Sequence, residues 1–192
     1  MDLLSILCLN KLKQEGGKKP TGTISISANG EYDVTNYATA NVSIPSQKLV
    51  MPNKIKFQYS ACTEMNFLSD CDFSSVTDAS SMFYGCSSLI SVPEFDTSKM
   101  ENVGSLFNQC TALTTVPVLN FASANWITNM YTGCSSLTDD SLNNILASLP
   151  GFTSWTGTKT LKYIGISSSL ASRCILLSNW STAQSAGWTT GY

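Results

Sequence analysis

Cysteine is the residue type in this sequence whose spacing most suggests chemistry. The chain of 192 residues contains seven cysteines and no histidine, and four cysteines recur at one constant interval, at Cys62, Cys86, Cys110 and Cys134. Without histidine the chain lacks a Ser-His-Asp or Cys-His catalytic arrangement and a histidine metal ligand, and it has no C-x-x-C pairs of the kind that hold zinc. Stacked coils lie about 4.8 Å apart, beyond the mean Cβ separation of about 3.8 Å in disulfides. We therefore expect a buried ladder of reduced thiols, with no catalytic residue, metal site or cofactor.

The charged residues form no recognisable catalytic motif either. Lys and Arg total 11 and Asp and Glu total 13, so the formal net charge is −2, and 12% of residues are charged. This balance argues against binding to nucleic acid. No apolar run reaches the roughly 18 residues of a membrane span, and no phosphate-binding or nucleophile-elbow motif occurs. The sequence thus predicts a protein that is not an enzyme, with no nucleic-acid partner and no membrane span.

The cysteines belong to a 24-residue repeat without gaps. Segments that begin at Asp72, Asp96 and Asn120 align on several apolar columns. These structural columns are Leu89, Leu113 and Leu137; Phe83, Phe107 and Tyr131; and the cysteines. A weaker first repeat, from about Leu49 to Cys71, places Tyr59 and Cys62 on the aromatic and cysteine columns. One unit cannot bury these side chains alone, so the units must stack around a continuous core.

The repeat resembles the BspA-like leucine-rich repeat family, in the variant found in Firmicutes surface proteins and prophages. The residues that carry the resemblance are 82–89 (MFYGCSSL), 95–98 (FDTS) and 131–137 (YTGCSSL). The resemblance implies an α+β solenoid: a short leucine-rich repeat stack with 24-residue units, preceded by a small antiparallel β module and an N-terminal helix. We divide the chain into an N-terminal helix or anchor with its linker (1–20), the β-strand module (21–47), the repeats (48–138) and a C-terminal cap (139–192).

The N-terminal segment predicts a short amphipathic helix without the features of a signal peptide. Its apolar positions are Leu3, Ile6, Leu7 and Leu12. The helix either packs on its own domain or serves as an anchor to a partner, since a Gly-Gly linker follows it.

The β module combines period-two alternation with an Asn29-Gly30 turn. We expect a three-stranded meander whose strands carry Ile24 and Ile26, Tyr32 and Val34, and Val42 and Ile44. The stretch resembles segments of tail and other virion proteins of bacteriophages.

The C-terminal region predicts a cap for the stack. A helix should begin after Thr138 or Asp139, bury Leu142, Ile145, Leu146 and Leu149, and stop at Pro150-Gly151. A strand with Leu161, Tyr163 and Ile166 and a short helix at 181–186 should follow. We assign the four tryptophans to cap or interface packing, with sugar platforms as the alternative.

Between the apolar columns the alternation exposes one strip, which is the candidate binding surface. It consists of Ile90, Ser91, Pro93, Thr114, Thr115, Pro117 and Thr138. A flat, neutral strip of this kind binds through hydrogen bonds and shape, or it is simply solvated surface.

These features together predict a bacteriophage virion structural protein: a tail, fibre or capsid-surface component assembled in the bacterial host cytoplasm. It would bind other virion proteins through its N-terminal segment and display the repeat for assembly or for a host-surface protein or glycan. The expected homo-oligomer is a trimer. The alternatives are a BspA-like bacterial surface adhesin and a cytoplasmic phage-encoded inhibitor of a host protein.

Overall fold

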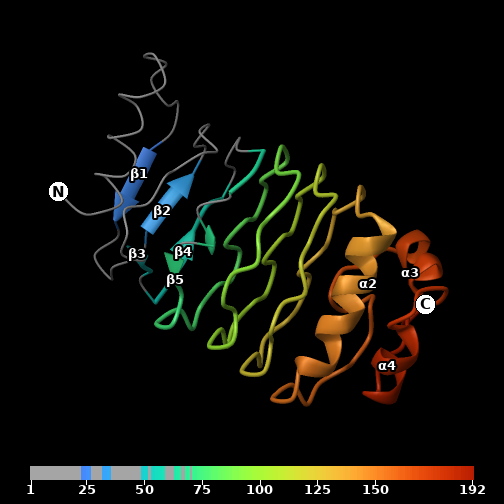
Figure 1. Cartoon of the computed structure of the whole chain (residues 1–192). Helices are drawn as coiled ribbons and strands as arrows, with labels where there is room; N and C mark the ends of the chain where they lie inside the picture. The colour runs from blue at the N-terminus through green and yellow to red at the C-terminus, as the bar shows by residue number, and fades with distance from the viewer. Residues whose placement is uncertain are drawn as a thin grey trace.

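The computed structural model describes residues 23–26, 32–35, 49–51, 53–58, 63–65, 68–69 and 71–192. The expected N-terminal helix with Leu3, Ile6, Leu7 and Leu12, the expected strand with Val42 and Ile44, and Cys62 lie outside the described residues. Within them, no helix is long and apolar enough to cross a membrane. Figure 1 shows successive turns of the chain lying side by side, with helices at the C-terminal end.

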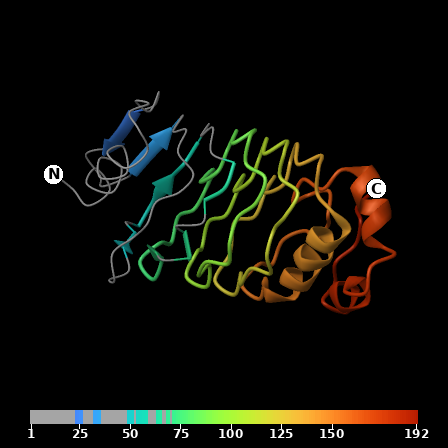
Figure 2. The ribbon, with the colours of Figure 1, turned by 45° about the horizontal axis from the view of Figure 1, so that its top comes forward.

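We call these turns the first coil (49–71), the second (72–95), the third (96–119) and the fourth (120–138). Isolated parallel bridges join Lys54 to Asp78, Asp78 to Asn102 and Asn102 to Trp126 along one line. A second line joins Glu64 to Ser91 and Ser91 to Thr115. The two lines are about half a coil apart in sequence, so they lie on different sides of the stack seen in Figure 2.

On one side of the stack, backbone hydrogen bonds at every second residue tie the second coil to the third and the third to the fourth. Ala79, Ser81, Phe83 and Gly85 donate to the carbonyls of Asn102, Gly104, Leu106 and Asn108, at 2.8, 2.8, 2.9 and 2.8 Å. The same set recurs one coil later, where Val103, Ser105, Phe107 and Gln109 donate to Trp126, Thr128, Met130 and Thr132. The ladder satisfies donors that the core would otherwise leave unpaired.

The aromatic column stacks in the core along the same axis. Phe83 and Phe107 lie 5.2 Å apart at an interplanar angle of 3°, and Phe107 and Tyr131 lie 5.7 Å apart at 17°. Leu89, Leu113 and Leu137 are buried beside them. Each ring therefore buries its faces between two neighbours, which a single coil cannot provide.

The constant register of the repeat fails in the first coil, and the assignment of its aromatic residue changes. Phe57, in place of the expected Tyr59, stacks on Phe83 at 5.7 Å and 11°. Lys54 pairs with Asp78 in the expected register, whereas Glu64 pairs with Ser91 in place of Ser88. The backbone of Phe57 donates to Met82, so tertiary hydrogen bonding fixes which aromatic residue enters the column.

The β module is joined to the first coil. Strand β1 (Thr23–Ile26) pairs antiparallel with β2 (Tyr32–Thr35), with Ile24 opposite Val34, as the hairpin prediction requires. The other edge of β2 pairs parallel with β4 (Ile55–Lys56), so the predicted three-stranded meander is wrong at that edge. Strand β3 (Leu49–Val50) pairs parallel with β5 (Cys71–Asp72), which brings the start of the first coil beside the start of the second.

Helix α2 (Asp139–Ser148) covers the end of the stack, followed by the short η2 (Leu149–Gly151). Thr138 is its N-cap and accepts from Ser141 N at 3.2 Å, and its buried face includes Leu142, Ile145 and Leu146, as predicted. The hydroxyls of Ser141 and Ser148 accept from Val116 N and Leu119 N, each at 2.9 Å. These serines lie on the face that the prediction assigned to apolar residues. They satisfy backbone donors of the third coil at the place where α2 follows the fourth coil.

Beyond α2 the prediction is only partly right. Helix α4 (Trp180–Ser185) lies close to the expected short helix, whereas α3 (Ser168–Cys174), capped by Ser167, was missed. The expected strand with Leu161, Tyr163 and Ile166 is absent, because the segment turns there. The carbonyls of Tyr163 and Ile164 accept from Asn129 and Tyr131 of the fourth coil.

Three of the four tryptophans are buried or partly buried in the cap, and one is exposed. Trp188 and Trp180 are buried in the cap, and Trp155 is partly buried against Tyr163, with ring centroids 5.5 Å apart. Trp126 is 58% exposed, so it is not packed in the cap, and its packing at an interface stays a prediction. Its alignment with Asp78 and Asn102 places it on the surface line of bridges.

Two positions in the second, third and fourth coils have left-handed backbone conformation. One is occupied by Ser81, Ser105 and Asn129, with φ of 57°, 56° and 59°. The other is occupied by Gly85, Gln109 and Gly133, with φ of 71°, 64° and 80°. Gln109 thus holds a conformation that favours glycine and that costs most other residues about 1–2 kcal/mol.

We expect Gln109→Gly to raise the free energy of unfolding by about 0.5–1 kcal/mol, because relief of left-handed strain exceeds the added entropy of the unfolded chain. Gly133→Ala should lower it by at least about 1 kcal/mol, because its Cβ would also lie 2.9 Å from Gln109 Nε2. Urea unfolding followed by circular dichroism measures both. Glu101→Gly, at an exposed position outside the left-handed set, is the control and should be destabilising. Destabilisation by Gln109→Gly would contradict the assignment.

Candidate binding surface

The predicted strip lies at the surface of three successive coils. Ile90 is 45% exposed, Thr115 and Thr138 are exposed, and the remaining four residues are half-buried. The alternate residues Leu89, Val92, Leu113 and Val116 are buried beneath them. Val118, 50% exposed, extends the strip and was not predicted, because period-two alternation from the buried Val116 would place it inside.

Two hydroxyl groups of the strip form hydrogen bonds that join one coil to the next. Thr114 Oγ1 donates to the carbonyl of Ile90 at 3.1 Å, and Thr138 Oγ1 donates to that of Thr114 at 3.0 Å. The backbone N–H groups of Thr114 and Thr115 also reach the Ile90 carbonyl. Because these hydroxyls are already engaged between coils, the strip is held rigid, and its outer surface offers fewer free donors than its composition suggests.

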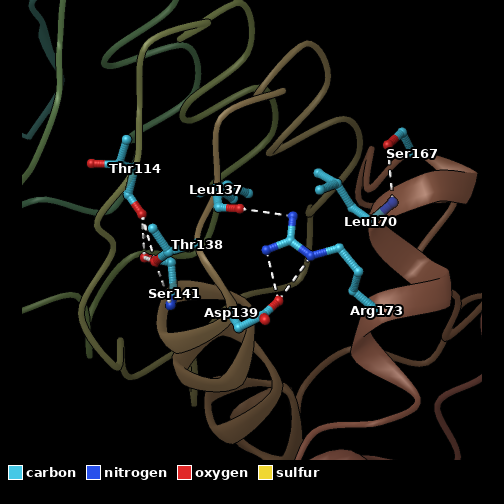
Figure 3. A network of polar contacts seen from close by, with 8 residues as sticks. All are labelled: Thr114, Leu137, Thr138, Asp139, Ser141, Ser167, Leu170 and Arg173. Atoms are coloured by element: carbon cyan, nitrogen blue, oxygen red, sulfur yellow. Dashed lines mark hydrogen bonds and ion pairs between the residues drawn. The ribbon is translucent and has the colours of Figure 1, made fainter.

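An ion pair at the end of the strip fixes α3 on the fourth coil (Figure 3). Nη2 and Nε of Arg173 lie 2.6 and 2.8 Å from Asp139 Oδ1. Nη1 donates to the Leu137 carbonyl at 3.1 Å. Asp139 also lies in the first turn of α2, where negative charge is favourable. The ion pair with Arg173 compensates the negative charge of Asp139, which lies next to Thr138. The strip residues themselves carry no charge.

Carboxylates elsewhere in the stack accept hydrogen bonds from backbone N–H groups of their own turns. Asp96 Oδ1 accepts from Ser98 N at 2.9 Å, and the hydrogen bonds from Ser98 lower the pKa of Asp96. Partial burial raises the pKa of Asp78, but hydrogen bonds from Ser80 and Lys54 outweigh it and lower that pKa overall. Lys54 Nζ lies 2.9 Å from Asp78. In the part of the chain that the structure describes, no three Cys, Asp or Glu side chains come together as a metal site.

The cysteines from the second coil to the fourth form a buried column of thiols that donate to backbone. The Sγ atoms of Cys86, Cys110 and Cys134 donate to the carbonyls of Phe57, Phe83 and Phe107 at 3.0, 3.0 and 3.1 Å. The neighbouring Cys86 thiol and burial raise the pKa of Cys110, and burial raises the pKa of Cys134 to about 12. A thiol so disfavoured as a thiolate is a poor nucleophile and a poor metal ligand.

We expect these three thiols to resist alkylation in the native protein at pH 8, at rates at least about 100-fold below those of the urea-unfolded chain. Peptide mapping by mass spectrometry after iodoacetamide treatment reports each cysteine separately. Thr115→Cys supplies an exposed thiol on the strip as the matched positive control. Labelling of Cys110 in the native protein within about tenfold of the unfolded rate would contradict the buried column.

A protein-family model now places the chain among known sequences. The model described as "Mycoplasma protein of unknown function, DUF285" matches residues 53–149. The matched region runs from beside the first bridge at Lys54, through all the later coils, to the residue that follows α2. It therefore extends past the boundary at 138/139 that we drew between repeats and cap. No curated protein and no solved structure matches the chain. Because the match covers half of the sequence and the whole of the regular stack, the chain belongs to the family of Mycoplasma proteins of unknown function, DUF285.

Proposed function

We propose that the protein is a non-enzymatic binding scaffold whose stack is a leucine-rich repeat of the BspA-like type. The spacing of the coils supports this, because side-chain hydrogen bonds join residues 24 apart, as between Thr114 and Ile90. The residues that carry the resemblance lie within the stretch matched by the family model. Among the described residues, the thiols of Cys86, Cys110 and Cys134 are buried and hydrogen-bonded, which suits a structural role for this column.

The observation that carries the proposal is the rigid, uncharged strip. Its residues come from three coils that are held in register by their backbone and by the hydroxyls of Thr114 and Thr138. A prealigned surface loses little conformational entropy when it binds. Without charge, it selects a partner by shape and short-range contact. Ile90 and Val118 supply the apolar contacts of such a surface.

The setting we propose is the bacteriophage virion, with the chain as a tail, fibre or capsid-surface component. The resemblance of residues 22–44 to virion protein segments supports it, together with the prophage variant that the repeat resembles. In this proposal the N-terminal segment with Leu3, Ile6, Leu7 and Leu12 attaches to other virion proteins. The repeat faces outward to a host-surface protein or glycan, and the chains assemble as trimers.

Mass spectrometry of gradient-purified particles tests the setting. We expect the full chain to sediment with particles, and a variant lacking residues 1–20 to remain at the top of the gradient. Detection in the wall fraction of uninfected cells would favour an adhesin instead. Recovery in the cytoplasm with a host protein, and absence from particles, would favour an inhibitor. Either result would overturn the virion proposal.

The strip is tested separately by placing charge on it. We expect Ile90→Lys and Thr115→Lys to weaken attachment to host cells or to the neighbouring assembly protein by about tenfold or more, since each would bury an unpaired charge at the interface. Thr182→Lys, at an exposed site on α4, is the matched control and should leave attachment unchanged. Equal attachment of the strip variants and the control would exclude the strip as the binding surface.

A further inference from the structure

A shallow pocket of about 280 Å³ lies along the other line of bridges, half a coil away from the strip. Residues of the second, third and fourth coils line it, and none of them is charged. They are Ser80, Ser81, Asn102, Gly104, Ser105, Trp126, Thr128 and Asn129. The pocket therefore combines one large aromatic side chain with hydroxyl and amide groups.

The position of Trp126 in the repeat explains why its ring is at the surface. In the preceding coils the equivalent side chains fold back on their own turns: Asp78 Oδ1 accepts from Ser80 N at 2.9 Å, and Asn102 Oδ1 accepts from Gly104 N at 3.1 Å. An indole cannot accept in this way, and Trp126 is left 58% exposed. The structural role of the column does not require tryptophan there.

The edge of the Trp126 ring packs against Gly104. A Cβ atom at Gly104 would lie 2.7 Å from Cδ1 and 3.0 Å from Nε1 of the indole, so the ring edge rests against the glycine backbone. Here glycine serves close approach rather than a special backbone conformation, because its φ is not left-handed. The ring is supported before any ligand arrives, and little side-chain entropy remains to be lost on binding.

Polar groups around the ring remain available. Within the described residues, three kinds of group donate no hydrogen bond: the Ser81 hydroxyl, the Nδ2 groups of Asn102 and Asn129, and the indole Nε1. The Ser80 hydroxyl is engaged with Asp78. Thr128 Oγ1, in contrast, is engaged with Tyr163 Oη at 2.8 Å. No buried polar side-chain atom of the described part lacks a partner, so the free groups face solvent.

We propose that this pocket is a subsite for a neutral carbohydrate. One pyranose ring would place its C–H face on the Trp126 indole, whose negative face attracts polarised C–H groups. Its hydroxyls would accept from the amides of Asn102 and Asn129 and exchange hydrogen bonds with Ser81. The hydroxyl-rich, uncharged lining matches a neutral sugar better than an acidic one. It also matches a sugar better than a protein hot spot, since Trp126 is the one large apolar side chain among the described residues that line the pocket.

The site is independent of the virion proposal, because it rests on the local geometry of Trp126 and its lining. A shallow pocket with one aromatic platform should bind weakly, with Kd of about 1 mM. Saturation-transfer NMR on the full chain suits this range. The probes are maltotriose, cellotriose, mannotriose and chitotriose, with sialyllactose as the acidic comparison. We expect transfer to at least one neutral probe and weaker transfer to sialyllactose.

Variants assign the signal to the pocket. Trp126→Ala should reduce affinity at least about tenfold, and Asn129→Gly should reduce it severalfold without backbone strain, because φ there is 59°. Leu176→Ala removes another exposed apolar side chain, 83% exposed just beyond the end of α3, and should bind as the wild type does. Circular dichroism confirms that each variant is folded. Three results would each overturn the proposal: no transfer to any neutral probe at about 10 mM, undiminished transfer in folded Trp126→Ala, or stronger binding of sialyllactose.

Discussion

The coil-to-coil hydrogen-bond ladder is the constraint on which the rest of the structure depends. Alternate residues, such as Ala79, Ser81, Phe83 and Gly85, send their N–H groups to the next coil, and the pattern repeats one coil later. From the second coil to the fourth, the ladder keeps one spacing and the same two left-handed positions. A residue that is inserted or lost displaces every bond that follows. The first coil shows this, because Lys54 keeps the regular register with Asp78 whereas Glu64 pairs with Ser91 in place of Ser88.

The unusual composition follows from the same constraint. The sequence contains 29 Ser and 20 Thr, and many of their hydroxyls donate to carbonyls one coil away, as Ser123 does to Ser98 at 2.7 Å and Ser136 to Thr111 at 2.7 Å. The cysteine column does the same inside the core, with thiols donating to the carbonyls of the aromatic column. Short donor side chains thus hold the coils together on the outside and in the core. Charge is not needed for this, which is consistent with the low proportion of charged residues.

The sequence predicted the parts of the fold that repeat and missed those that interrupt the repeat. Columns such as Phe83 and Phe107 are visible because three units share one spacing, and α2 is visible from its cap and its apolar face. The replacement of Tyr59 by Phe57 depends on a tertiary hydrogen bond that no local pattern encodes. The segment around Ile164 looked like a strand because its buried residues are closely spaced, although they belong to a turn.

The two candidate surfaces differed in how much the sequence could show. The strip was predictable from alternation, but the engagement of its hydroxyls between coils was not. The Trp126 pocket was missed because its lining comes from three coils and because Gly104 matters through the side chain that it lacks. Its signal in the sequence was the single tryptophan in a column otherwise occupied by Asp78 and Asn102.

The central claim, that whole coils are the interchangeable units of this structure, is tested by deleting one of them. Removal of residues 96–119 joins Phe95 to Asn120 and leaves equivalent columns adjacent, with Val92 and Phe95 where Val116 and Leu119 had faced α2. Because a repeat contacts mainly its neighbours, this variant should still unfold cooperatively in urea, with a smaller m value than the wild type. Removal of residues 96–107, half a coil, should abolish the cooperative transition. Loss of cooperative unfolding in the whole-coil deletion, to the same extent as in the half-coil deletion, would contradict the account.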